Sequence, residues 1–161
     1  MQGHRGEGSG QKRRGGAATT LLLVFVSLAS AQIRSDTSQP AVRFATVDVL
    51  IDPHGSDLAA YQLEFLADPA RVTLVGIEGG QHPAFKVPPY YDPKALAGNR
   101  VVLAALNAGT DLPNSKTRVA TLHLQIKGDA KPAMSAKLVV AASANEKTID
   151  ADVYVSEGAM Q

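Results

Sequence analysis

Residues 120–127, Ala120-Thr121-Leu122-His123-Leu124-Gln125-Ile126-Lys127, alternate strictly between apolar and polar side chains. A period of two residues predicts a β-strand with one face in a core and the other face in water. The same alternation occurs at residues 61–65 and 149–156, and Val47, Val49 and Ile51 repeat it earlier in the chain. These four stretches predict half-buried strands.

Three other runs, at residues 72–77, 101–106 and 138–142, are apolar or nearly so on both faces. The last two predict central strands with both faces covered, and Gly76 in the first predicts a bulge. Turn-forming residues separate all of these runs, and Asp92 followed by Pro93 predicts one helical turn over 92–96. Strands joined by turns in this way predict an all-β fold, an antiparallel β-sandwich.

Two segments resemble cohesin domains. The alternating strand at 58–65, the turn Asp68-Pro69 and the strand at 72–77 resemble the early strands of that family, and Val119–Gly128, which ends in Lys-Gly, resembles its late strand. The resemblance covers nearly all of residues 42–158. It implies a nine-stranded jelly-roll of the cohesin and carbohydrate-binding type. It also implies a non-catalytic role, since cohesins bind dockerin modules and so assemble polysaccharide-degrading complexes.

The first 31 residues have the pattern of a signal peptide. Lys12, Arg13 and Arg14 precede an uncharged apolar run, and Ala29-Ser30-Ala31 fits a cleavage site. The alternative is a membrane anchor, but the apolar run is shorter than the roughly 20 residues that span a bilayer. We therefore expect a secreted or periplasmic protein without an integral membrane anchor after cleavage. It would consist of a linker at 32–41, a domain at 42–158 and a tail at 159–161.

Composition excludes several classes of function. The 161 residues include no cysteine, which excludes disulfides, zinc fingers and iron–sulfur clusters. Cleavage after Ala31 removes four basic residues and one acidic residue, leaving 12 basic and 14 acidic residues and a net charge of −2. That balance argues against a nucleic-acid partner.

No cofactor, metal or enzymatic activity is expected from the sequence motifs. The acidic turn that contains Asp48, Asp52, His54 and Asp57 has no known metal-ligand spacing. The glutamates at 64, 78, 146 and 157 show no pairing of the kind that a glycosidase needs. The chain also lacks the Gly-x-Ser-x-Gly elbow of serine hydrolases outside the leader.

The best candidate binding segment is the irregular stretch from Gly79 to Pro93, which contains His82, Tyr90 and Tyr91. A long irregular connection in a compact domain is usually functional, and tyrosines held between prolines would give a stiff contact surface. The alternative interpretation is that Phe85 and one tyrosine close the open end of the sandwich.

Two further candidates, His123 and Tyr154, lie on predicted polar strand faces. His123 could form a recognition face with Gln62 and Glu64, and Tyr154 stands between Asp150 and Asp152. The alternative for both is an ordinary exposed strand residue.

Two functions follow, a protein-docking module and a polysaccharide-binding module. Sugar rings stack on exposed aromatic planes. Without tryptophan, the chain could offer only its tyrosines for this purpose, and Tyr61 is expected in the core. Docking to a dockerin-like protein module is therefore the favoured interpretation.

Overall fold

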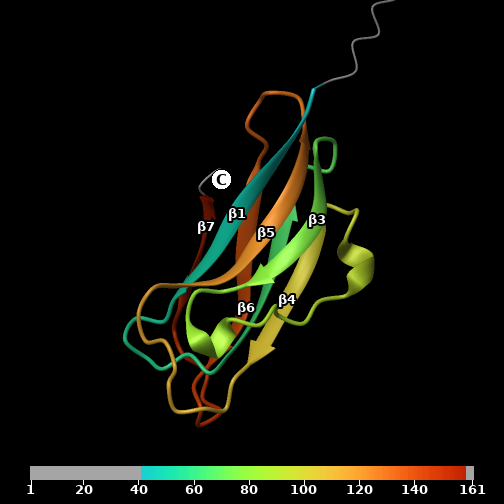
Figure 1. Ribbon diagram of the computed structural model, residues 1–161. Coiled ribbons are helices and arrows are strands. Elements are labelled where there is room, and N and C mark those ends of the chain that lie inside the picture. The colour runs from blue at the N-terminus through green and yellow to red at the C-terminus, as the bar shows by residue number, and fades with distance from the viewer. Residues whose placement is uncertain (1–40, 159–161) are drawn as a thin grey trace, which may run out of the picture. The chain divides into compact units, whose positions relative to one another are not determined.

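The structure, a computed structural model that describes residues 41–158, is an antiparallel β-sandwich (Figure 1). One sheet has four strands in the order β3-β5-β1-β7, and the other has three in the order β4-β2-β6. The strands are β1 Val42–Asp52, β2 Ala60–Ala67, β3 Val72–Gly79, β4 Arg100–Leu106, β5 Thr117–Lys127, β6 Met134–Ala142 and β7 Asp152–Glu157. The predicted signal peptide, almost all of the predicted linker and the predicted tail lie outside the described residues.

The alternation in the sequence places the core. On β2, Tyr61, Leu63 and Phe65 point inward and are buried, while Gln62 and Leu66 on the other face are exposed. Strand β5 buries Ala120, Leu122, Leu124 and Ile126 in the same way. The inner faces of both sheets thus form one hydrophobic core, which also includes Val47, Val49, Ile51, Leu58, Val72, Leu74, Phe85, Val101, Leu103 and Val119.

Each sheet is bent by bulges in which one strand carries an extra residue. The register between β3 and β5 shifts between Leu74 and Gly76, which leaves Val75 without a partner and confirms the bulge predicted there. A second shift makes Val119 the extra residue opposite β1, and a third makes Val139 the extra residue opposite β2. Bulges increase the local twist and re-aim side chains.

The prediction that residues 101–106 and 138–142 are central strands is wrong. They lie in β4 and β6, which are the two edges of the three-stranded sheet. Their outward apolar side chains are not covered by another layer, and Leu106 and Val139 are 74% and 54% exposed. The doubly apolar pattern therefore marks an exposed apolar surface instead of a buried strand.

The connection between β3 and β4, residues 80–99, covers one side of the sandwich. Ala97 and Gly98 exchange backbone hydrogen bonds with Leu74 at the edge of β3, and Tyr90 exchanges two with Ala104 at the edge of β4. The segment contains two short 3₁₀ helices, η1 Pro83–Phe85 and η2 Pro93–Ala95. The side chain of Asp92 caps η2 by accepting from the Lys94 N–H at 2.9 Å, as the sequence predicts.

Close backbone approaches explain the glycine pair that opens this connection. A Cβ on Gly79 would overlap the carbonyl of Lys86, and one on Gly80 would overlap the carbonyl of Arg118. The pair therefore lets the chain fold back tightly enough to bury Phe85, whose ring meets Tyr61 edge-on at 5.2 Å between centroids.

Candidate functional site

The outer face of the three-stranded sheet is a broad surface with exposed apolar side chains. Strand pairing aligns Tyr90, Ala104, Gln62 and Val140 in one row across the sheet. Directly paired residues of antiparallel strands share a face, so the Tyr90 ring lies on this surface. Of the ten large apolar residues exposed in the described part of the chain, six lie on this sheet or its flank: Leu66, Val87, Tyr90, Leu106, Val139 and Val140.

Polar groups interrupt this apolar surface near its middle. Glu64 of β2 forms an ion pair with Arg100 of β4, and Lys137 of β6 lies directly opposite Glu64. Gln62 and Ser135 are exposed on the same face. We call this surface the docking face, with Leu66, Tyr90, Leu106 and Val140 as its main apolar members. An apolar patch with a few charged and amide groups has the composition of a protein interface.

The two adjacent tyrosines of the candidate segment have different surroundings. Tyr90 is 82% exposed, whereas Tyr91 is half-buried and packs against the core. Phe85 is buried as well, so Phe85 and Tyr91 do pack inward, as the alternative interpretation expected. The same segment thus supplies both core residues and an exposed ring.

The polar contacts of His82 are with its own turn and with Asp111, and none is with Tyr90. Its Nδ1 accepts a hydrogen bond from the Ala84 N–H at 3.2 Å and so caps η1, and its Nε2 lies 3.8 Å from Asp111. A cleft of about 530 Å³ lies between this turn and residues 111–117. The capping contact gives His82 a structural role in shaping the turn.

The outer face of the four-stranded sheet contains a groove of about 720 Å³. Its floor is polar: the Thr121 hydroxyl donates to Asp48 at 2.7 Å, the Arg118 guanidinium lies 3.6 Å from the same carboxylate, and His123 Nε2 lies 3.0 Å from Glu78. Phe44 and Val75 form apolar walls. We call this the sheet groove.

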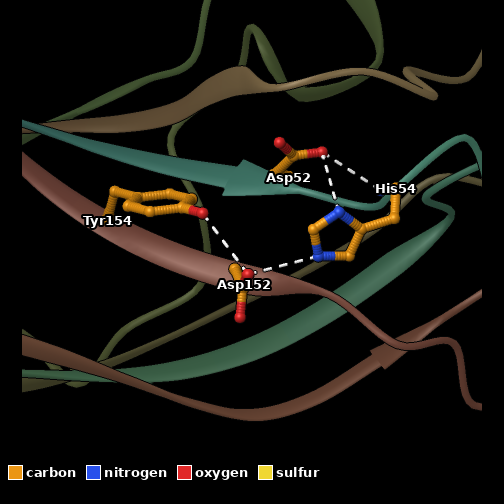
Figure 2. A network of polar contacts seen from close by, with 4 residues as sticks. All are labelled: Asp52, His54, Asp152 and Tyr154. Carbon is orange, nitrogen blue, oxygen red and sulfur yellow. Dashed lines mark hydrogen bonds and ion pairs between the residues drawn. The ribbon is translucent and has the colours of Figure 1, made fainter.

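Tyr154 lies on the same sheet, in a polar cluster beside the end of β1 (Figure 2). Its hydroxyl donates to Asp152 at 3.3 Å, and His54 Nε2 lies 3.2 Å from that carboxylate. The Lys116 ammonium sits 3.7 Å from the centroid of the Tyr154 ring. The Asp152 carboxylate raises the pKa of Tyr154, because it disfavours the phenolate.

The candidate residues therefore do not form one site. Tyr90 lies on the docking face, His123 and Tyr154 lie on the opposite sheet, His82 caps a turn and Tyr91 packs inward. The expected face that combined His123 with Gln62 and Glu64 is wrong. These residues belong to different sheets, and each points away from the core.

The acidic residues considered for metal binding or catalysis are dispersed. In residues 41–158 no group of three or more His, Asp or Glu side chains has the arrangement of a metal site. Asp48 bonds Thr121, while Asp52 and His54 approach each other at 3.7 Å. Glu64 and Glu78 lie on different sheets, and Lys131 lowers the pKa of Glu157 by hydrogen bonding to it.

The sequence singled out Tyr90 of the docking face and His123 of the sheet groove, but not the other residues that form these two surfaces. Phe44, Val75, Arg118 and Thr121 approach one another only after β1, β3 and β5 pair. For the rest of the docking face the available signal was the doubly apolar pattern of 101–106 and 138–142, because a strand that is apolar outside without a covering layer exposes a patch.

Comparison with known proteins gives one structural relationship. The chain matches no family model, and it matches no curated protein in sequence. It is similar to a chain of the crystal structure, at pH 5.5, of a complex between a variant of CaDoc0917 and CaCohA2, which is a dockerin–cohesin complex. The TM-score is 0.53 and the identity 12%, over 67% of this chain and 82% of the other. At this identity the similarity shows a shared cohesin-like β-sandwich fold. Residues 41–158 form seven strands, so the nine strands that the family resemblance implies are not found in them.

Proposed function

We propose that this chain is a non-catalytic docking module that binds a folded protein through its docking face. The observation that carries the proposal is the concentration of exposed apolar side chains on β4-β2-β6, with an exposed tyrosine at the rim. Gathered exposed apolar side chains among polar groups are a feature of protein-interaction surfaces, and tyrosine is enriched among the residues that contribute most to binding energy.

The polar groups of the docking face would set the specificity of binding. Glu64 and Arg100 satisfy each other in the free protein, so docking would not leave either charge unpaired. Lys137 and Gln62 remain exposed on either side of Glu64 and offer donors to a partner. This favours a partner with an apolar ridge and acidic or carbonyl groups around it.

A dockerin-like module is the partner class that we propose. The cohesin-like fold and the presence of a dockerin in the related crystal structure support this choice. The proposal extends to polysaccharide-degrading assemblies and to a secreted or periplasmic location, supported by the leader-like residues 1–31. In residues 41–158, no helix is long and apolar enough to cross a membrane. Finding Gln32 as the N-terminus of the exported protein by mass spectrometry would test this location.

Polysaccharide binding through a tyrosine platform is the weaker proposal. Such a platform needs neighbouring exposed rings, whereas Tyr90 and Tyr154 lie on different sheets and Tyr91 is half-buried.

Calorimetric titration of the purified chain with a panel of purified dockerin modules tests the docking proposal. We expect at least one module to bind, and we expect Tyr90→Ala and Leu106→Ser each to weaken that affinity by about tenfold or more. Val42→Ser is the matched control, because Val42 is also an exposed apolar strand residue but belongs to the other sheet. Binding by none of the modules, or binding insensitive to both docking-face variants, would refute the proposal.

A further inference from the structure

The sheet groove has the features of a second binding site, on the sheet opposite the docking face. Its volume of about 720 Å³ lies within the range of small-molecule pockets. It is lined by residues of β1, β3 and β5, including Phe44, Asp48, Val75, Glu78, Arg118 and His123. The bulge at Val75 sets Gly76 opposite His123, whose ring lies directly beside it.

The charged side chains of the groove are of both signs, and a histidine lies beside one of the two carboxylates. Arg118 faces Asp48 at 3.6 Å, and His123 faces Glu78 at 3.0 Å. An anionic ligand would meet the two carboxylates, and a cationic ligand would meet the arginine. The groove nevertheless presents many donors and acceptors, so its chemistry favours an uncharged ligand rich in hydroxyl groups.

Two nitrogen atoms of the groove are buried and lack a hydrogen-bond partner. Arg118 Nε has none within the described residues, and His123 Nε2 approaches Glu78 without hydrogen-bond geometry. Buried polar atoms are normally paired, and each orphan has a free-energy cost. The Arg118 side chain as a whole is 37% exposed, so a ligand in the groove would meet its terminal guanidinium nitrogens and not the buried Nε.

The groove also has an aromatic wall. Phe44 lines the groove and is 69% exposed, whereas phenylalanine is more often buried. A pyranose ring combines an apolar C–H face with a hydroxyl edge, so it can stack on such a ring while its hydroxyls bond to charged side chains.

We propose that the sheet groove binds a neutral saccharide, which stacks on Phe44 and hydrogen-bonds to Asp48, Glu78 and Arg118. The site lies on the sheet opposite the docking face, so the proposal does not depend on the docking function. A single domain of this kind could hold a protein partner and a polysaccharide at once.

The test is affinity gel electrophoresis of the purified chain in gels containing xylan, mixed-linkage β-glucan or galactomannan, together with an array of neutral oligosaccharides. A gel containing polygalacturonate reports binding to an acidic polymer. We expect retardation by at least one neutral polymer, and we expect Phe44→Ala to reduce the affinity about tenfold. Arg118→Gln should reduce it too, while Val42→Ser and Tyr90→Ala should leave it unchanged.

Each other outcome overturns the proposal. Absence of binding to every neutral polymer and array sugar would do so, as would retardation by polygalacturonate alone. Unchanged retardation in Phe44→Ala would place any sugar site elsewhere. Should Arg118→Gln unfold, the Phe44 variant still decides, because truncation of an exposed side chain leaves the core intact.

Discussion

Truncation of Phe85 tests how the connection between β3 and β4 is held. Phe85 is buried, its ring contacts Tyr61 edge-on at 5.2 Å between centroids, and it belongs to η1, one of the two short 3₁₀ helices of the connection. Replacing a buried phenylalanine by alanine costs about 3–5 kcal/mol. Total stability of a domain is about 5–15 kcal/mol, so Phe85→Ala removes a large share of it.

Thermal unfolding followed by circular dichroism measures this loss. For a domain of this size each kcal/mol corresponds to roughly 4 °C, so we expect the midpoint to fall by about 12–20 °C. Phe44→Ala is the matched control, since the same truncation at an exposed ring should change stability by less than about 0.5 kcal/mol.

A double-mutant cycle isolates the ring contact. Phe85→Leu and Tyr61→Leu, made singly and together, should show a coupling energy of about 0.5–1.5 kcal/mol. A loss below about 1 kcal/mol in Phe85→Ala, or a coupling of zero, would show that η1 does not anchor the connection. Because that connection carries Tyr90, Phe85→Ala should also weaken partner binding below its unfolding temperature.

Three further predictions concern single sites. Gly80→Ala should destabilise the domain by about 2 kcal/mol or more in denaturant unfolding, because the new Cβ would overlap the Arg118 carbonyl. Gly76→Ala is the control and should cost less, because its Cβ would make an ordinary 3.5 Å contact with His123. Burial raises the pKa of Tyr61, so above pH 10 the unfolded chain loses its phenol proton while the folded chain keeps it. The free energy of unfolding therefore falls by up to about 1.4 kcal/mol per pH unit. Tyr61→Phe should reduce this alkaline loss of stability, measured by denaturant unfolding at several pH values. Asp152→Asn should lower the pKa of Tyr154, because it removes the carboxylate that disfavours the phenolate. The Tyr154 titration is obtained by subtracting the phenolate absorbance of a Tyr154→Phe variant. An unchanged pKa would mean that the two side chains are not in contact in solution.

The sequence predicted the strands well because each inward face alternates with a polar outer face. Residues 61–65 and 120–127 show this most clearly, and the Asp92-Pro93 cap was equally readable because it depends on neighbouring residues alone. The prediction for β4 and β6 was wrong because a doubly apolar strand has the same composition whether another layer covers its outer face or that face is exposed.

The candidate sites were harder to predict because their residues come together only through pairing of distant strands. Tyr90 was identified, yet its neighbours Gln62 and Val140 depend on the register of β2 with β4 and β6. His123 was assigned the wrong neighbours because a polar strand face can belong to either sheet. The sheet groove combines Phe44 of β1, Val75 of β3 and His123 of β5, which only the order of the strands in the sheet brings together.

The connection at residues 80–99 has a consequence for self-assembly. A sandwich with free edges on both sides could add copies head to tail without limit, as in a fibril. Here Ala97 and Gly98 occupy the backbone groups of Leu74 on β3, and Tyr90 occupies those of Ala104 on β4, so the connection obstructs strand addition at both of these edges. The long connection therefore protects these two edges against edge-to-edge polymerisation of the protein at high concentration.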